Sequence, residues 1–186
     1  NYCMVIEEKY MRRAIQLAKN GIENTSPNPI VGAVIVYEGQ IVGEGYHRCY
    51  GEGHAEVNAI ASVKNKEILL QSTIYVTLEP CSHHGKTPPC AQLIIDSKIP
   101  NVVVGSLDPF EKVSGRGVKM LQKAGINVIT RVLEEECKAL NPHFITAHSF
   151  KRPFVTLKWA QSQDGYMDII RNIDEFPAKF STETTS

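Results

Sequence analysis

The stretch that decides the fold runs from His54 to Cys90. It opens with His54-Ala55-Glu56 and closes with Glu79-Pro80-Cys81-Ser82-His83-His84-Gly85-Lys86-Thr87-Pro88-Pro89-Cys90. Between these ends, the pattern of apolar residues predicts a helix over residues 55–63 and a buried strand over residues 72–78. The two prolines before Cys90 predict that another helix begins there, because proline is favoured in the first turn of a helix. A helix, a strand and a helix in this order are typical of a layered α/β domain.

Three side chains in this stretch are suited to bind zinc. The imidazole of His54 and the thiols of Cys81 and Cys90 form a set of three ligands, which leaves the fourth position of a tetrahedral zinc ion for water. The predicted helix starts favour ionised thiols, because the N-terminal end of a helix carries a partial positive charge. Glu56 lies two residues after the imidazole and is not needed as a ligand. We therefore expect zinc as the cofactor and Glu56 as the catalytic group that moves protons to and from the water.

Other interpretations of these residues remain open at this point. His54, Cys81 and Cys90 could be ordinary buried residues, or three ligands of a structural zinc site whose fourth ligand lies elsewhere. Glu56 could be an acidic residue that complements the dipole of a helix start. The combination of His-x-Glu with Pro-Cys and a further cysteine, placed at predicted helix starts, favours the catalytic zinc site.

Outside this stretch, helices and strands continue to alternate. An amphipathic helix is predicted first, followed by a hairpin whose turn is Glu38-Gly39. The expected elements, in chain order around the central stretch, are a helix at 7–21, strands at 31–36 and 41–46, a helix from 90 to about 97, a strand at 101–106, a helix at 117–124, a strand at 126–129 and a helix at 133–148. The predicted fold class is therefore a three-layer α/β/α domain with a mixed sheet.

The last part of the chain differs from the rest. Lys151-Arg152-Pro153 precedes a new strand expected over residues 154–160, and residues 172–186 are polar and aperiodic. About 35 residues are too few for an independent hydrophobic core. We therefore expect a main domain over residues 1–150. Residues 151–186 would form a linker that leads into an extension of this domain or into the first strand of a second one.

Composition limits the classes of partner. The chain has 186 residues, of which 42% are hydrophobic, and its 20 basic and 20 acidic residues give a net charge of zero. Without a basic run, a nucleic-acid partner is disfavoured, and no apolar run approaches the length of a membrane span. The five cysteines are an odd number, which fits a reducing cytoplasm better than a disulfide framework. Cys3, Cys49 and Cys137 are expected to be plain thiols.

Several segments closely resemble the bifunctional deaminase–reductases of riboflavin biosynthesis. The matching segments are Ser-Pro-Asn-Pro-Ile-Val-Gly-Ala-Val at 26–34, Gly-Glu-Gly-Tyr-His at 43–47, His-Ala-Glu-Val at 54–57 and the whole run at 77–90. The His-x-Glu and Pro-Cys motifs are typical of zinc deaminases, but eight residues separate the two cysteines where the general signature has two. This longer segment sets the riboflavin family apart from cytidine and tRNA-adenosine deaminases. The resemblance covers about residues 7–150, and residues 156–165 resemble the opening of the family's reductase domain.

The resemblance implies a cytidine-deaminase-like fold and a hydrolytic deaminase. The implied substrate is a diaminohydroxy-pyrimidinone that carries a ribosylamino 5′-phosphate, and fold members can form homo-oligomers. The implied zinc ligands are His54, Cys81 and Cys90, with Glu56 as the proton shuttle. The implied substrate contacts are Asn28, His47, His83, Lys86 and Asp108, of which Lys86 is suited to bind a phosphate.

Two departures from the family pattern affect these expectations. Phe110 stands where the family has asparagine, so one polar contact to the substrate is missing or replaced. The chain is also too short for a complete reductase, so we expect neither reductase activity nor NADPH binding from it. Two alternative functions are a nucleoside, nucleobase or tRNA deaminase and a zinc-stabilised interaction module without catalysis. The neutral charge and the His-His-Gly-Lys segment disfavour the first of these.

Overall fold

The structure is a computed structural model that describes residues 6–22, 24–83, 88–110, 114–150, 152 and 154–157. The chain divides into two compact units, Asn1–Phe154 and Val155–Ser186. The first unit contains all the helices and strands described below. In the second unit only residues 155–157 are described, and they have no regular secondary structure.

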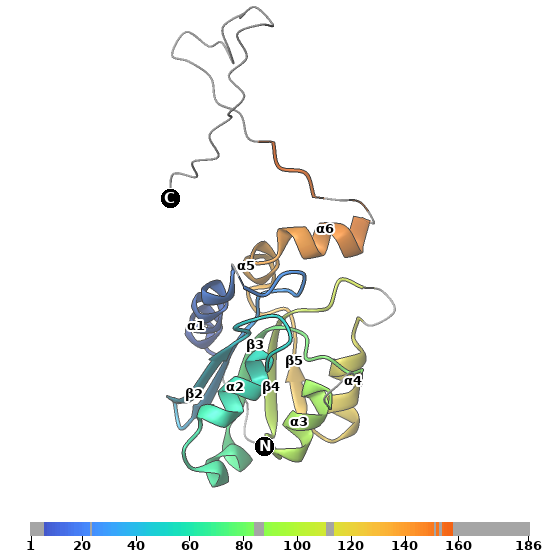
Figure 1. The fold of residues 1–186 in the computed structure, drawn as a ribbon. Coiled ribbons are helices and arrows are strands. Elements are labelled where there is room, and N and C mark those ends of the chain that lie inside the picture. The colour runs from blue at the N-terminus through green and yellow to red at the C-terminus, as the bar shows by residue number, and fades with distance from the viewer. Residues whose placement is uncertain are drawn as a thin grey trace, which may run out of the picture. The chain divides into compact units, whose positions relative to one another are not determined.

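The first unit is built on a five-stranded mixed sheet (Figure 1). The strands lie in the order β2-β1-β3-β4-β5, and β1 pairs antiparallel with both β2 and β3, whereas β3, β4 and β5 are parallel to one another. The bounds of the strands are β1 Gly32–Tyr37, β2 Gln40–Tyr46, β3 Thr73–Leu78, β4 Asn101–Ser106 and β5 Asn127–Ile129. The predicted mixed sheet that opens with an antiparallel hairpin is therefore confirmed.

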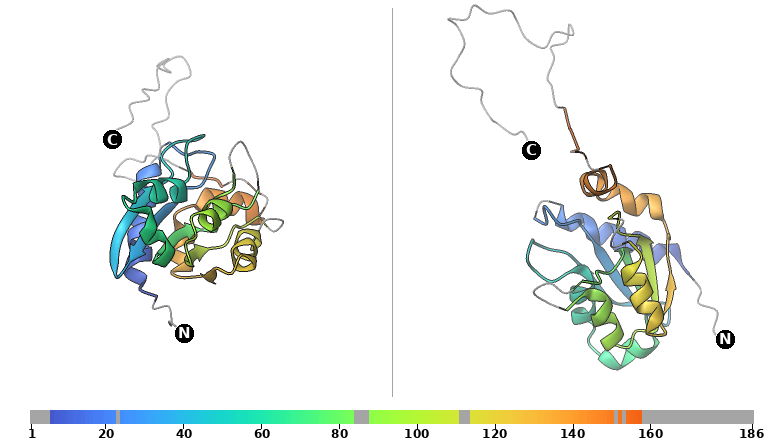
Figure 2. Two further views of the ribbon diagram at one scale, coloured as in Figure 1. Left: turned by 90° about the horizontal axis from the view of Figure 1, so that it is seen from below. Right: turned by 90° about the vertical axis from the view of Figure 1, so that its right-hand side faces the viewer.

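Helices cover both faces of this sheet (Figure 2). The helices are α1 Glu8–Ala18, α2 Ala55–Ser62, α3 Cys90–Asp96, α4 Arg116–Lys123, α5 Glu134–Ala139 and α6 Pro142–Phe150, with 3₁₀ turns η1 Lys19–Gly21 and η2 Lys66–Gln71. Alternate residues along a strand face opposite sides, so Ile35 and Ile74 pack under α2 and α3, while Val34 and Tyr75 pack under α1 and α5. The three layers predicted from the sequence are confirmed.

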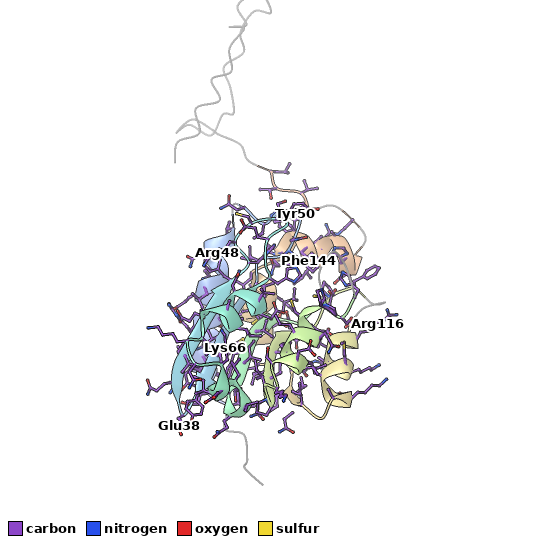
Figure 3. All side chains as sticks on the ribbon, turned by 60° about the horizontal axis from the view of Figure 1, so that its bottom comes forward. Glu38, Arg48, Tyr50, Lys66, Arg116 and Phe144 are labelled. Carbon is purple, nitrogen blue, oxygen red and sulfur yellow. The ribbon has the colours of Figure 1, made fainter. Side chains whose placement is uncertain are left out.

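Helix α2 lies unusually close to strand β2. A Cβ atom at Gly45 would lie 2.3 Å from the backbone nitrogen of Ala59 and 2.5 Å from the carbonyl oxygen of Ala55, so only glycine fits at this position. At the C-terminal end of α2, Lys66 donates hydrogen bonds to the carbonyl oxygens of Ala61, at 3.1 Å, and Val63, at 2.7 Å. Lys66 is labelled in Figure 3. These contacts fix the position of α2, whose N-terminal end follows directly after His54.

Two expectations for the end of the chain are wrong. Residues 133–148 were expected to form one helix, but they form α5 and α6 with a break at Leu140 and Asn141. Pro142 causes the break, because proline has no N–H and disfavours the helical conformation of the residue before it. The described residues 154–157 are not in a strand, and the rest of that expected strand lies outside the described residues. None of the helices in the described part of the chain has the length and apolar character that crossing a membrane requires.

Candidate active site

The structure brings His54, Cys81 and Cys90 together. His54 and Cys90 lie at the N-terminal ends of α2 and α3, and Cys81 follows the C-terminal end of β3. The Nδ1 atom of His54 lies 3.2 Å from Sγ of Cys90 and 3.7 Å from Sγ of Cys81. The ligand atoms of these three residues all lie within 4.8 Å of one another. The three residues are 27 and 9 positions apart in the sequence, so the fold creates this cluster.

This cluster fits zinc. A tetrahedral zinc ion with its usual bond lengths holds nitrogen and sulfur ligands about 3.5 Å apart. The two distances from His54 to the sulfur atoms, 3.2 Å and 3.7 Å, lie on either side of this value. One nitrogen and two sulfur ligands are also a donor set that zinc prefers.

The pKa values of the two thiols are shifted in opposite directions. Hydrogen bonding from the Cys90 thiol lowers the pKa of Cys81, with further hydrogen bonds from His54 and from the backbone N–H of Cys90, whose nitrogen lies 3.2 Å from Sγ of Cys81. The same hydrogen bond to Cys81, together with burial, raises the pKa of Cys90. The hydrogen bond with Cys81 also raises the pKa of His54. A divalent cation bound here would displace the proton between the sulfur atoms, because metal ligands bind as thiolates.

Glu56 lies in the first turn of α2 and is buried, with an exposed fraction of 3%. Burial raises the pKa of its carboxyl group to about 7, because removal from water disfavours the charged form. Its side chain also interacts with the Cys90 thiol. A carboxyl group with these properties, next to the ligand cluster, can accept and return a proton near neutral pH.

His47 and Asn28 form a second group beside the cluster. The His47 ring is buried, with 3% exposed, and meets the His54 ring edge-on with 5.4 Å between centroids. Nδ1 of His47 lies 3.3 Å from the carbonyl oxygen of Gly53, and Nε2 lies 3.4 Å from Nδ2 of Asn28. Because a carbonyl oxygen only accepts, Nδ1 carries the proton and Nε2 accepts from the Asn28 amide. Burial lowers the pKa of His47, which favours this neutral form.

The position of Asp108 depends on Glu79, a residue to which sequence analysis assigned no role. The Glu79 carboxylate is 7% exposed and accepts hydrogen bonds from four backbone N–H groups, of Asp108 at 3.1 Å, Gly115 at 2.9 Å, Gly117 at 2.9 Å and Val118 at 3.3 Å. A Cβ atom at position 117 would lie 2.1 Å from the carbonyl oxygen of Pro80, so glycine is required there. The sequence contained one signal for this role, because Glu79 is a charged residue between a buried strand and Pro80-Cys81. A carboxylate buried at such a place needs hydrogen-bond donors around it.

The structure describes only some of the remaining residues that were predicted to contact the substrate. His83 is exposed and lies two residues after Cys81, whereas Lys86 lies outside the described residues. Oδ1 of Asp108 accepts a hydrogen bond from the backbone nitrogen of Phe110, 2.8 Å away. The Phe110 ring is 41% exposed and meets the ring of His148 on α6 with 5.9 Å between centroids. Phe110 is therefore turned toward α6.

Comparison with known proteins agrees with the geometry of the cluster. Residues 4–106 match the family model described as cytidine and deoxycytidylate deaminase zinc-binding region. The diaminohydroxyphosphoribosylamino-pyrimidine deaminase of Buchnera aphidicola is 53% identical over 135 residues, which are 73% of this chain and 90% of that protein. The chain belongs to the family of these zinc-binding deaminases. The resemblance found in the sequence and the zinc-binding character of the domain are thereby confirmed.

Other members of the deaminase family are longer proteins. The riboflavin biosynthesis protein RibD of Actinobacillus pleuropneumoniae is 53% identical over 156 residues, 84% of this chain and 41% of that protein. A crystal structure of the diaminohydroxyphosphoribosylaminopyrimidine deaminase/5-amino-6-(5-phosphoribosylamino)uracil reductase from Thermotoga maritima has a TM-score of 0.78 and 48% identity. That match covers 91% of this chain and 50% of the solved chain. The chain thus spans about two fifths to one half of these longer relatives.

Proposed function

We propose that this chain catalyses the hydrolytic deamination of the diaminohydroxy-pyrimidinone ribosylamino 5′-phosphate of riboflavin biosynthesis. The observation that carries the chemistry is the meeting of His54, Cys81 and Cys90 within 4.8 Å beside the buried carboxyl group of Glu56. The substrate assignment is supported by 53% identity to a diaminohydroxyphosphoribosylamino-pyrimidine deaminase of which the chain covers 90%. In the proposed reaction, water replaces an amino group on the pyrimidine ring, which becomes a carbonyl group, and ammonia leaves.

His54, Cys81 and Cys90 would hold the zinc ion. When bound, zinc is a Lewis acid that lowers the pKa of water and so supplies a nucleophile near neutral pH. The nitrogen of His54 and the two sulfur atoms lie at the ends of three different elements of the sheet and its covering helices. This placement fixes the three ligand atoms before the metal binds, which limits the conformational cost of binding.

Glu56 would move the proton. Its carboxylate accepts a proton from the attacking water and donates it to the leaving amino group, so that ammonia, and not an amide anion, leaves the ring. Two features support this role. Glu56 is the second residue of α2, directly after the N-cap His54 and Ala55, so the helix fixes both side chains relative to each other. Its side chain is also shielded from bulk water.

Four residues would contact the substrate, and His47 would orient one of them. Asn28 offers its carbonyl oxygen, because one N–H of its amide is directed at His47, and His47 keeps the Asn28 amide in this orientation. The carboxyl group of Asp108 and the exposed imidazole of His83 would bind the ring and the sugar. Lys86 would bind the phosphate, as a flexible ammonium group can. The position of Lys86 between two zinc ligands in the sequence supports this assignment.

The experiment that tests the proposal compares two substrates. The purified protein, loaded with zinc, is supplied with the phosphorylated diaminopyrimidine and, separately, with cytidine, and the release of ammonia is measured. We expect release from the first substrate and little from the second. Release from cytidine alone would replace the proposal with a nucleoside deaminase. Release from neither, with zinc bound, would favour an interaction module without catalysis.

Several further expectations belong to the same proposal. We propose residues 1–150 as the deaminase domain and residues 151–186 as a linker with the start of a reductase domain. A cytoplasmic location is supported by the free thiols of Cys49, Cys81, Cys90 and Cys137. Neither nucleic acid nor membrane is expected as a partner, and assembly into homo-oligomers is compatible with the fold.

A further inference from the structure

The side chain of Asn141 binds the backbone of Ile30, a residue 111 positions earlier in the chain. Its Oδ1 atom accepts a hydrogen bond from the Ile30 nitrogen at 2.7 Å, and its Nδ2 atom donates to the Ile30 carbonyl oxygen at 2.9 Å. We propose that Asn141 is a positioning residue for substrate binding, which acts by holding the Pro-Asn-Pro loop (residues 25–30) and thereby the amide of Asn28. This inference rests on the proposed function.

The use of the Asn141 side chain is unusual for its place in the sequence. Asn141 directly precedes α6, whose first residue is Pro142, and asparagine before proline is typical of a helix N-cap. An N-cap side chain normally accepts hydrogen bonds from the free N–H groups of its own helix. In the described part of the chain, both side-chain hydrogen bonds of Asn141 go instead to Ile30. Its side chain therefore serves a contact between distant segments in place of local helix capping.

The loop and the facing junction of two helices leave a space between them. A cavity of about 440 Å³ lies between the loop and the junction of α5 with α6. Its lining includes Pro27, Asn28 and Pro29 on one side, and Pro142, His143 and Phe144 on the other. Phe144 lies on α6 (Figure 3). Beside this space, the two hydrogen bonds between Asn141 and Ile30 link the two segments directly.

The contacts of the loop lead from Asn141 to the zinc ligands. Ile30 is two residues from Asn28, whose backbone nitrogen donates to the carbonyl oxygen of Thr25 at 2.8 Å. The Asn28 amide meets His47, and the His47 ring meets the ring of His54. A displaced Ile30 would shift Asn28 away from His47, and the amide would lose the orientation that presents its carbonyl oxygen to a substrate. His54 itself would stay in place, because α2 holds it.

The test is a double-mutant cycle. Asn141→Ser removes both hydrogen bonds to Ile30 but keeps a residue that is favoured at the N-cap of α6. The cycle compares wild type, Asn141→Ser, Asn28→Ala and the double variant, with KM, kcat and zinc content measured for each. Asn127→Ser is the matched control, since it removes one exposed side-chain hydrogen bond, to Asn101 at 3.1 Å, at the opposite end of the parallel strands.

We expect a KM about tenfold higher for Asn141→Ser, since two neutral hydrogen bonds are lost, with kcat within about threefold of wild type. Zinc content and the control's constants should be unchanged. In the Asn28→Ala background, Asn141→Ser should have no further effect on KM, because both act through one group. The role of Asn141 would be overturned if the KM changes of the two single variants multiply in the double variant. A loss of zinc in Asn141→Ser would also overturn it.

Two additions keep the outcome clear. If Asn141→Ser does not fold, Asn141→Asp is used, because the carboxylate still accepts from Ile30 and lacks only the donor. A KM equal to wild type in Asn141→Asp would then overturn the inference, and a raised KM that vanishes in the Asn28→Ala background would support it. The cycle is measured with the pyrimidine that wild type deaminates. A wild-type protein that deaminates none overturns the proposed function and this inference together, whereas an active wild type with a multiplicative cycle overturns the inference alone.

Discussion

The backbone nitrogen of Asp108 donates a hydrogen bond to the carboxylate of Glu79, 3.1 Å away. Glu79 is two residues before Cys81, and Asp108 is two residues after the end of β4. The same carboxylate accepts from Gly115 and Gly117, which lie just before and within the first turn of α4. A single buried side chain therefore joins the turn that carries Cys81, a proposed zinc ligand, to the loop that carries a proposed substrate contact.

Substitution of Glu79 should affect stability. Glu79→Gln replaces one accepting oxygen with an NH₂ group that faces backbone N–H donors. The free energy of unfolding should fall by about 2 kcal/mol, since hydrogen bonds to a buried charged group are lost. Chemical denaturation measures this change. Glu67→Gln, which changes an exposed residue of η2, is the control and should unfold close to wild type. Equal midpoints for both variants would show that the Glu79 contacts contribute little.

Metal analysis should distinguish the two ligand cysteines from the other thiols. Cys81→Ser and Cys90→Ser each remove one sulfur ligand, so the zinc content should fall from about one per chain to well below that value. Cys49→Ser, which changes a free thiol outside the cluster, should keep full zinc content. Zinc retained in both ligand variants would contradict the assignment of the site.

Glu56 should be needed for turnover and not for metal binding. Glu56→Gln keeps the size of the side chain and removes its ability to exchange a proton. Deamination should fall by at least about 10²–10⁴-fold, which is typical of lost acid–base catalysis, while zinc content stays the same. The comparison requires ammonia release and metal analysis on the same sample. Near-normal turnover of Glu56→Gln would remove Glu56 from the mechanism.

There is a physical reason why the sequence was sufficient to predict that His54, Cys81 and Cys90 meet. His54, Cys81 and Cys90 lie at junctions of predicted elements, and in a layered α/β fold the carboxyl ends of strands meet the starts of the following helices. The strands were also clear, because β1, β3 and β4 are runs of β-branched residues buried on both faces. At these positions the secondary structure predicted from the local sequence is the one that the folded domain has.

Contacts between distant backbone groups could not be predicted in the same way. Glu79 and Asn141 accept hydrogen bonds from backbone N–H groups of residues 29 to 111 positions away. Every residue except proline has such a group, so the pattern of side chains does not indicate which one is bound. The break between α5 and α6 was a different kind of error. The apolar periodicity of residues 133–148 suggested one helix, although Pro142 is incompatible with an uninterrupted one.

Phe110 should be replaceable by the asparagine of the family pattern. Its ring meets His148 and is 41% exposed, and its backbone nitrogen, which any residue provides, binds Asp108. Phe110→Asn should therefore keep kcat/KM at the wild-type value or raise it, because an added amide can bind the substrate. Steady-state kinetics with the phosphorylated diaminopyrimidine measure this. A large fall in kcat/KM would mean that the phenyl ring itself takes part in binding.

Lys86 should bind the phosphate of the substrate. It lies five residues after Cys81 and four before Cys90, so both ends of its segment are fixed next to the proposed zinc ligands. A ribosylamino phosphate would extend away from the reacting carbon, within reach of a long and flexible ammonium group. Lys86→Ala should raise KM about tenfold to a hundredfold, since one charged hydrogen bond is lost, with a smaller effect on kcat if the contact is equal in ground and transition states.

The control for Lys86 is Lys64→Ala, an exposed lysine after the C-terminal end of α2, which should leave both constants unchanged. The unphosphorylated nucleoside provides the second comparison. If Lys86 binds the phosphate, wild type and Lys86→Ala should deaminate the nucleoside equally slowly. The nucleoside has no phosphate, so the loss of Lys86 removes no further contact. An unchanged KM in Lys86→Ala, together with equal rates on the nucleoside and its phosphate, would contradict the proposed substrate. The zinc site and the role of Glu56 would be unaffected by that result, since neither depends on the phosphate.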